Sequence, residues 1–577
     1  MNNLDNLRHS CAHLLAAAVT DLYPKAQRTI GPAIENGFYY DFDLLPASQE
    51  ELLRIETKMH EIVKTWSKFE SREVSPDEAK KIYKNNPYKL DLINEFAGQK
   101  ITIYKSGNYE DLCRGGHVEH PDKALKHFKL LSVAGAYWRG DEKNKMLTRI
   151  YGTVFPTKEE LDKYLWQQEE AKKRDHRKLG SQLGLWTFSE HVGSGLPLFT
   201  QKGALVRQLI CEHIESLQIK QGIAQVWTPQ IVKAELFKIS GHYDKYRENL
   251  FSVRSNYSDE EFFLKPMNCP QHTQIYASQS RSYRDLPLRL ADFAMLYRDE
   301  KPGELLGLNR VRSFSQDDCH IFCREDQIEY EMNMALDMTK QIMETYGFKY
   351  KYRLSLHDPQ HPEKYLGDKE TWDKAEKLSE KILKDRGMEY FPGVGEAAFY
   401  APKLDLIATD SIGREWQLST LQIDFFMPQR FGLTYIDEKG QKQVPVMLHR
   451  AIAGSLERLM AVLIEHYAGA FPTWLAPVQV AVIPVSDKFA QYAQSVTNQL
   501  KSQNIRAELN AKNEPLNARI RDAQLQKVPY ILVVGNREAQ SDSVSVRHRG
   551  SKESQSQSLS QFSTSISEEI SSRAIAY

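Results

Sequence analysis

The sequence lacks both net charge and long apolar segments. Its 76 Lys and Arg residues balance 76 Asp and Glu residues over a length of 577. No run of eighteen apolar residues occurs, which argues against a membrane-spanning helix. The first twenty residues carry Asp5, Arg8, His9 and His13, and such a polar start does not fit a secretory signal. These absences predict a cytosolic (cytoplasmic) protein without a membrane partner.

Cysteine is also scarce, and internal repeats are not seen. Six cysteines are too few for a disulfide scaffold in a chain of this length. We predict that all of them are reduced thiols, each by default a small buried side chain. They are Cys11, Cys113, Cys211, Cys269, Cys319 and Cys323.

The chain is too long for a single hydrophobic core, so several domains are expected. Residues 157–179 are polar and begin with Thr157 and Glu160, which fit a capping box, and they predict an exposed linker helix. The segment FPTWLAP, 471–477, is bracketed by prolines and predicts a second boundary. The expected domains are 1–156, 180–470 and 471–577.

The strand and helix patterns predict an α+β multidomain fold. Segment 180–470 contains long strand-like runs, such as RVRSFSQDDCHIF and REWQLSTLQIDFF, which favour an antiparallel sheet with helices packed on it. Segment 478–550 alternates strand-like and helix-like stretches, which is typical of a small α/β domain.

One predicted strand, residues 310–322, has a polar face. Side chains alternate between the two faces of a strand. One face then carries Arg310, Arg312, Phe314, Gln316, Asp318 and His320, and the other carries Val311, Ser313, Ser315, Asp317, Cys319 and Ile321. The first set is typical of a polar cleft with an anionic ligand. A solvated sheet face is the alternative that this strand alone leaves open.

A second strand brings further charge to the same place. The stretch ADFAMLYRDE, 291–300, places Arg298 and Glu300 on one face, only a loop away from the polar strand. Together the two strands offer three arginines to one cleft. Bidentate guanidinium contacts suit phosphate or carboxylate, so the cleft is predicted to bind an anion.

These segments resemble the signature motifs of a known family. YRDE followed by RVRSFSQDD resembles motif 2 of class II aminoacyl-tRNA synthetases, and HRAIAGSLERL, 449–459, resembles motif 3. GALVRQLICEHIESLQIKQGIAQVWTPQIV resembles motif 1. KPMNCPQH and QDDCHIF narrow the resemblance to the threonyl-tRNA synthetases, and DLCRGGHVEH and FPTWLAPVQV extend it over essentially the whole chain.

The resemblance implies a ligase that uses ATP to join L-threonine to tRNA(Thr). It implies a class II antiparallel-sheet catalytic domain, an α/β editing domain at 1–156 and an α/β anticodon-binding domain at 471–577. Motif 1 implies a homodimer. Many members carry a small domain before the editing domain, and this chain is expected to lack it.

The family binds one zinc ion, and the matching residues here are Cys269, His320 and His449. Three protein ligands leave a fourth position open for a substrate. Local spacing would instead favour Cys319 and Cys323, but strand parity points Cys319 away from His320.

The resemblance also assigns the amino-acid and ATP sites. It implies that zinc engages the amino and hydroxyl groups of threonine, with Asp318 accepting from the hydroxyl. Mg²⁺ accompanies ATP. By the same resemblance, Gln316 and Tyr400 complete the amino-acid pocket. The residues that match catalytic positions are Arg298, Gln316, Asp318, Tyr400, Lys403 and Arg458, and those that match ATP-binding positions are Arg298, Glu300, Arg310, Phe314, Gln417 and Arg458. Gln271 departs from the usual Gly, and we expect a local loop change only.

The third domain is expected to contact the anticodon. The residues that match the family's base-contacting positions are Asn513, Arg521, Lys527, Glu538 and Arg547. Lys527 replaces the usual Arg, which puts a bidentate contact there in doubt. Without the resemblance, RIRDAQLQK reads as a solvated helix face.

The stretch RHSCAHL, 8–14, puts His9 and His13 on one side of a predicted helix, opposite a stripe of leucines. Small alanines beside them leave room for a ligand. Both histidines could simply face water, or they could join Cys113 and His117 in a tetrahedral zinc site. In the family, the matching residues form a metal-free editing site that hydrolyses seryl-tRNA, together with Lys89 and Asp111. Gly116 replaces the usual Pro.

Editing follows from the substrate's chemistry, since serine lacks only one methyl of threonine and a methyl gives roughly 1–3 kcal/mol of discrimination. Two other functions fit the sequence less well. A tRNA-binding regulator is expected to lose the motif arginines or the zinc ligands, and these are present. A zinc hydrolase is disfavoured because no HExxH motif occurs.

Overall fold

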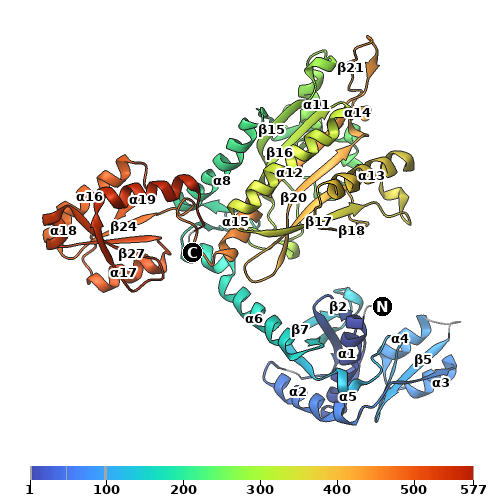
Figure 1. Cartoon of the computed structure of the whole chain (residues 1–577). Helices are drawn as coiled ribbons and strands as arrows, with labels where there is room; N and C mark the ends of the chain where they lie inside the picture. The colour runs from blue at the N-terminus through green and yellow to red at the C-terminus, as the bar shows by residue number, and fades with distance from the viewer. Residues whose placement is uncertain (1–2, 47, 96–99, 576–577) are drawn as a thin grey trace. The chain divides into compact units, whose positions relative to one another are not determined.

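The computed structural model describes residues 3–46, 48–95 and 100–575 (Figure 1). The chain divides into two compact units, residues 1–169 and 170–577. Among the residues described, no helix has both the length and the apolar character to cross a bilayer. All six cysteines are free thiols, as predicted.

The first unit combines helices with two antiparallel sheets. Its helices are α1 (Asn3–Leu22), α2 (Glu51–Ile62), α3 (Pro76–Ile82), α4 (Pro87–Glu95) and α5 (Pro121–Ala124). Its strands are β1 (Gln27–Arg28), β2 (Ala33–Ile34), β3 (Gly37–Asp43), β4 (Glu70–Val74), β5 (Ile101–Ser106), β6 (Tyr109–Leu112), β7 (His127–Tyr137) and β8 (Met146–Phe155). One sheet has the order β1-β3-β8-β7, with β2 paired to β3, and the other has the order β4-β5-β6.

Helix α1 is buried on nearly every side. Its leucine stripe lies in the core, as predicted, but Ala12, Ala16 and Ala17 of the other face are buried as well. The helix packs against α2, β3 and β8, and small residues allow these close approaches. The expectation that the alanines leave room for a ligand is therefore wrong. His13 is only 4% exposed, so the two histidines do not both face water.

The predicted linker helix is two helices, α6 (Lys158–Arg174) and α7 (His176–Gln182). The capping box at the start of α6 forms as predicted: Glu160 N donates to Thr157 Oγ1 at 3.2 Å, and Thr157 N donates to the Glu160 carboxylate at 3.2 Å. The prediction of one continuous helix is wrong at Asp175, whose carboxylate accepts from Arg177 N at 2.8 Å and caps a new helix.

The second unit is built on an eight-stranded sheet. Its strands are β11 (Ala224–Gln225), β15 (Leu288–Tyr297), β16 (Ser313–Cys323), β17 (Lys349–Leu356), β18 (Tyr390–Val394), β19 (Lys403–Thr409), β20 (Glu415–Asp424) and β23 (Val446–Ser455). Their order is β11-β15-β16-β23-β20-β19-β17-β18. The predicted antiparallel sheet is confirmed, apart from parallel pairs at the two edges. β15 ends before Arg298 and Glu300, which lie in the following loop rather than on the strand.

Helices and small sheets pack around the eight-stranded sheet. The helices are α8 (Gln201–Lys220), α9 (Ala234–Ser240), α10 (His242–Lys245), α11 (Cys269–Ala277), α12 (Ile328–Thr345), α13 (Lys369–Asp385), α14 (Met427–Arg430) and α15 (Leu456–His466). The small sheets pair β9 (Trp186–Thr187) with β10 (Leu198–Phe199), β21 (Tyr435–Ile436) with β22 (Lys442–Gln443), and β12 (Ile231–Lys233), β14 (Phe262–Leu264) and β13 (Ser252–Val253). The apolar side chains of α8, α12, α13 and α15 form one large core with the sheet.

The C-terminal part is a five-stranded sheet with the order β25-β24-β26-β27-β28. Its strands are β24 (Val480–Pro484), β25 (Ala507–Leu509), β26 (Tyr530–Val534), β27 (Ser543–His548) and β28 (Gln555–Ser558), and its helices are α16 (Ala490–Ser502), α17 (Leu516–Leu525), α18 (Asn536–Ser541) and α19 (Leu559–Ser572). The predicted alternation of strands and helices over 478–550 is confirmed in β24, α16, β25, α17, β26 and β27.

Acidification is expected to destabilise the second unit through His213, which lies on α8 against Trp474. Burial, with Arg573 and Lys220 nearby, lowers the pKa of His213 to about 3. Between that value and the ordinary histidine pKa, the unfolded chain binds a proton that the folded chain does not. Stability therefore falls as pH falls through this window, by up to about 1.4 kcal/mol per pH unit.

The measurement is the thermal midpoint between pH 8 and pH 4 for the wild type and for His213→Leu. The variant should lose less stability on acidification, and its midpoint at pH 8 gives the cost of the packing change alone. Parallel curves would show that His213 does not contribute to the acid sensitivity.

Candidate active site and a second histidine cluster

The predicted cleft residues line one cavity of about 710 Å³ in the second unit. They are Cys269, Arg298, Glu300, Arg310, Phe314, Gln316, Asp318, His320, Tyr400, Lys403, Gln417, His449 and Arg458. Arg312 is an exception. Its guanidinium donates to the Glu300 carbonyl at 2.8 Å instead of pointing into the cavity.

Strand register explains how distant residues meet. His320 on β16 lies opposite His449 on β23, and His449 lies opposite Gln422 on β20. The three side chains therefore form a row across adjacent strands on the same face of the sheet. Cys319 belongs to the apolar core on the other face, as strand parity predicted.

Cys269, His320 and His449 form a buried group that fits a metal ion. Their donor atoms lie within 4.8 Å of one another. His320 Nε2 is 3.0 Å from His449 Nδ1, and His449 Nε2 is 2.9 Å from Asp424 Oδ2. A carboxylate on the far nitrogen orients the imidazole and leaves its other nitrogen free for a metal.

The neighbouring carboxylates of Asp318 and Asp424 also favour a cation at this group. Burial, reinforced by Asp318 and Asp424, raises the pKa of the Cys269 thiol well above its ordinary value. A divalent cation in contact with the sulfur stabilises the thiolate form. Burial lowers the pKa of His320, which keeps the ring neutral, as a metal ligand must be.

Small polar groups surround the cysteine–histidine group. Tyr400 OH donates to Gln422 Oε1 at 3.2 Å, and the Asp318 carboxylate accepts from Asn268 N at 3.3 Å. Asp318 Oδ1 is 3.7 Å from His320 Nε2. This end of the cavity therefore offers closely spaced hydrogen-bond donors and acceptors, which suit a small polar molecule.

The opposite end of the cavity concentrates positive charge. Burial and the neighbouring Arg298 and Arg310 lower the pKa of Arg458. The Arg298 guanidinium lies 4.9 Å from the centre of the Phe314 ring, and its Nε is buried without a hydrogen-bond partner among the described residues. Arg310 is balanced by Glu300 at 2.7 Å. Arginines gathered in this way are stabilised when a polyanion binds.

Sequence patterns missed two residues that contact His320 and His449. Asp424 continues the polar positions Thr420 and Gln422 at every second residue of β20, so strand parity could have found it. His272 Nδ1 lies 2.8 Å from His320 Nδ1. Its position three residues after Cys269 places it on the same helix face, which was also a usable signal.

Gln271 does not change a loop, contrary to expectation. It lies inside α11, and its Nε2 donates to the Pro229 carbonyl at 2.8 Å. This bond ties the helix that begins with Cys269 to the segment after α8.

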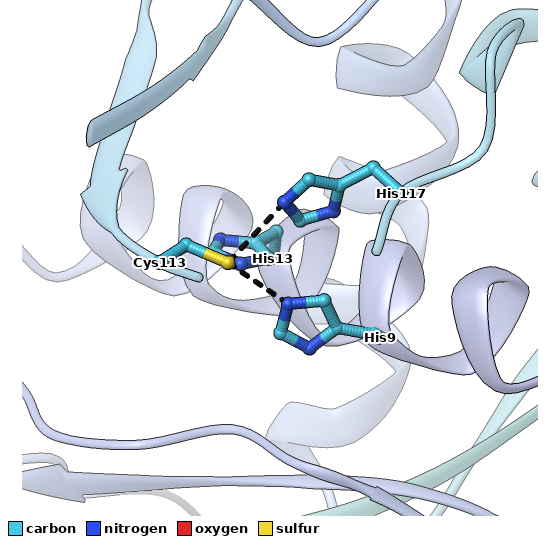
Figure 2. Close-up of side chains that lie close together, drawn as sticks. All are labelled: His9, His13, Cys113 and His117. Carbon is cyan, nitrogen blue, oxygen red and sulfur yellow. Dashed lines mark hydrogen bonds between the residues drawn. The ribbon is translucent and has the colours of Figure 1, made fainter. Parts of the chain in front are cut away.

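Four further residues form a cluster in the first unit (Figure 2). The Cys113 sulfur lies between two imidazoles, 3.0 Å from His9 Nε2 and 3.3 Å from His117 Nε2. The His13 ring lies 4.9 Å from both the His9 and His117 rings, centre to centre. All four donor atoms lie within 4.8 Å of one another, so this group could also hold a metal.

Lys89 and Asp111 lie together in a buried network next to this cluster. Lys89 Nζ is 2.8 Å from Asp111 Oδ1, and Tyr40 OH and Tyr109 OH donate to Asp111 Oδ2 at 2.6 and 2.9 Å. Burial opposes the ionised carboxyl, but Lys89 and Arg28 hold the pKa of Asp111 well below its usual range. The two tyrosines and Arg28 were not predicted.

The ring and thiol groups of the cluster are neutral at physiological pH. Burial, with His9 nearby, lowers the pKa of His117 to about 3, and burial lowers the pKa of His13 well below its usual value. Burial raises the pKa of Cys113 to about 11. Neutral imidazoles can orient water through hydrogen bonds, and a neutral thiol is a weak nucleophile.

Gly116 has a conformational role in this cluster. Its φ is +84°, and Gly115 before it has a φ of +97°. Proline fixes φ near −65°, so the Pro usual at this position in the family cannot adopt this loop. The loop brings His117 against Phe69, with ring centres 4.1 Å apart.

The five predicted anticodon residues come from one small sheet domain. Asn513 precedes α17, Arg521 lies on α17, Lys527 follows it, Glu538 lies on α18 and Arg547 lies on β27. Asn513 and Arg521 are exposed. The Glu538 carboxylate accepts from Gly535 N at 2.9 Å, and Arg547 Nε donates to the Ser551 carbonyl at 2.8 Å, so both also stabilise local structure.

Three sequence families match parts of the chain. Residues 251–467 match "tRNA synthetase class II core domain (G, H, P, S and T)", residues 479–569 match "Anticodon binding domain", and residues 101–151 match "Threonyl and Alanyl tRNA synthetase second additional domain". With the antiparallel sheet and its cavity, these matches define a class II aminoacyl-tRNA synthetase.

Individual relatives narrow the class. The chain is 49% identical to the threonine–tRNA ligase of Rubrobacter xylanophilus over 94% of this chain and 85% of the relative, and 46% identical to that of Dehalococcoides mccartyi over 95% and 94%. It therefore belongs to the threonine–tRNA ligase family. A crystal structure described as the RNA binding domain of threonyl-tRNA synthetase from Cryptosporidium parvum is similar, with a TM-score of 0.65 and 37% identity over 68% of this chain and 98% of that one.

Proposed function

We propose that the chain activates L-threonine with ATP, transfers it to tRNA(Thr), and hydrolyses seryl-tRNA formed in error. The observation that carries the synthetic reaction is one cavity with a Cys–His–His group at one end and converging arginines at the other. A zinc ligand set suits a small amino alcohol, and the arginines suit a triphosphate.

At the threonine end, Cys269, His320 and His449 would hold zinc, one ion per chain. The ion would supply a Lewis acid for the amino and hydroxyl groups of threonine. Asp318 accepts from the hydroxyl, and Gln316, Tyr400 and Lys403 complete the pocket. Valine lacks the hydroxyl, and a site built around such a group rejects the analogue without it by roughly 10⁴.

At the ATP end, Arg298 binds the α-phosphate and the threonine carboxylate, and Arg458 binds the γ-phosphate. Mg²⁺ enters with ATP and neutralises phosphate charge. The adenosine and the remaining phosphates contact Glu300, Arg310, Phe314 and Gln417. The reaction is attack of the threonine carboxylate on the α-phosphorus, with loss of pyrophosphate. It depends on positioning and on neutralised charge rather than on a general base.

For editing, His9, His13, Cys113 and His117 surround the seryl ester, while Lys89 and Asp111 support the site. A neutral imidazole that accepts a proton can activate or orient water for ester hydrolysis. The neutral imidazoles and the thiol that lies between two of them are the groups that would orient this water.

The remaining partners belong to the same proposal. The anticodon is contacted by Asn513, Arg521, Lys527, Glu538 and Arg547.

A second copy of the chain covers the exposed apolar side chains Ile219, Trp227 and Ile231 near the end of α8, which makes the enzyme a homodimer. Aminoacylation serves translation, so we place the enzyme in the cytoplasm.

The zinc ligands give the direct test. Cys269→Ser should lose the zinc ion and abolish threonine-dependent exchange of pyrophosphate into ATP, because a serine hydroxyl is a poor zinc ligand. Metal analysis and the exchange assay measure the two effects. Cys211→Ser, on α8, is the matched control and should retain both.

Wild-type exchange with threonine, serine and valine is measured alongside. Threonine and serine should support exchange and valine should not. Full zinc retention in Cys269→Ser would remove the metal assignment, and exchange without amino-acid preference would remove the threonine assignment.

A further inference from the structure

Asp175, His176 and Glu465 form a third close group of metal-ligand type, outside the cavity. The ring of His176 is 2% exposed, and both of its nitrogens already have partners. His176 Nε2 accepts from Leu308 N at 3.0 Å, so the ring proton resides on Nδ1, 2.6 Å from Glu465 Oε1. The ring therefore has no lone pair for a metal, and the group is a hydrogen-bonded clamp.

One side of the clamp is helix α15. Glu465 lies near the C-terminal end of that helix, where its Oε1 also accepts from His176 N at 3.0 Å. Its other oxygen is 2.6 Å from Arg414 Nη2, which fixes the carboxylate. Arg458, which lines the cavity, lies in the first turns of the same helix.

The other side of the clamp is the turn at 306–310. Leu306 N donates to the Arg310 carbonyl at 3.1 Å, and Arg310 N donates back to the Leu306 carbonyl at 3.3 Å. Gly307 in this turn has a φ of +51°, and a Cβ there would lie 2.2 Å from His176 Nε2. The turn therefore packs directly against the imidazole, with no room for a side chain at Gly307.

The turn leads directly into the cavity. Asn309 and Arg310 line it, and the Asn309 carbonyl accepts from Arg458 Nε at 3.3 Å. By accepting from Leu308 N, the imidazole holds the backbone next to Asn309, and the Asn309 carbonyl orients Arg458. Through Glu465 it holds the helix that carries Arg458.

We propose that His176 is a positioning residue for ATP, which sets the 306–310 turn and Arg458 in register without touching substrate. The inference rests on the proposed activation of threonine by ATP. Loss of the acceptor at Nε2 leaves the buried Leu308 N–H unpaired, and the turn moves to find another partner.

Two substitutions test the hydrogen bonds of the two ring nitrogens separately. His176→Gln carries an amide oxygen near the position of Nε2 and can still accept from Leu308 N. His176→Asn is shorter, so it can still donate to Glu465 but cannot reach Leu308. In threonine-dependent exchange, His176→Asn should raise the KM for ATP about tenfold with the KM for threonine unchanged, and His176→Gln should restore most of the ATP affinity.

The outcomes decide between positioning and general packing. Equal losses for ATP and threonine in both variants, or wild-type behaviour of His176→Asn, would overturn the proposal. If His176→Asn does not fold, Gly307→Ala serves instead. It should raise the KM for ATP in the wild type and add less in a His176→Gln background, where a flexible side chain replaces the ring, and additive effects would overturn the proposal. Absence of threonine-dependent exchange in the wild-type protein would contradict the proposed function itself.

Discussion

Arg458→Ala is expected to reduce threonine-dependent ATP–pyrophosphate exchange at least about a hundredfold, the scale for losing one preorganised charge contact. Arg458 lies with Arg298 and Arg310 around one end of the cavity, and burial and these neighbours lower its pKa. Arg298 and Arg310 repel the Arg458 guanidinium, and the negative charge of bound ATP would offset this repulsion. The variant should still bind tRNA, because the proposed anticodon contacts lie in another part of the chain.

Arg298→Ala should show a comparable loss, since Arg298 is proposed to bind both the α-phosphate and the carboxylate that attacks it. Arg324→Ala is the matched control. Its guanidinium pairs with Asp326 at 2.8 Å beyond the end of β16, so exchange should be nearly unchanged. Rapid exchange in either Arg298→Ala or Arg458→Ala would remove the ATP role from that residue.

Strand parity predicted the polar face of β16 well. Gln316, Asp318 and His320 line the cavity, and Cys319 lies in the core behind them. The prediction succeeds because a strand alternates its side chains whatever it pairs with. It fails at Arg312, which lies before the strand begins, where a loop turns its guanidinium toward the Glu300 carbonyl.

Residues alone could not predict which strands meet. His320 and His449 are direct cross-strand neighbours, although 129 residues separate them. Pairing between strands that are distant in sequence is set by the register of the whole sheet, which local spacing does not encode. The resemblance to a family supplied this grouping before the structure did.

The first helix shows the opposite limit. The leucine stripe of α1 correctly predicted a core-facing side, but the alanine side is buried too, because α1 lies between α2 and the sheet strands β3 and β8. The hydrophobic pattern predicts one buried face of a helix, but it does not predict a second contact made by small residues. For the same reason the sequence could not show that His13 is buried.

The histidines His9 and His13 on this helix lead to the second large expected effect. A double variant, His9→Ala with His13→Ala, should lose at least about a hundredfold in the rate of seryl-tRNA deacylation, within the range of general acid–base catalysis. His9 contacts the Cys113 thiol, and His13 packs edge-on against His117, so the substitution removes half of the cluster. Threonine-dependent exchange should be unchanged, and so should zinc binding at the proposed site of Cys269, His320 and His449.

The same variant decides between editing and a second metal site, since four donor atoms within 4.8 Å fit either interpretation. If the cluster is a closed zinc site, the double variant loses one zinc ion per chain relative to the wild type, and the metal interpretation wins. If the cluster edits, zinc content stays constant and seryl-tRNA accumulates when serine, ATP and tRNA are supplied. His120→Ala, an exposed histidine three residues after His117, is the matched control and should deacylate normally. Normal deacylation by the double variant would remove the hydrolytic role from both histidines.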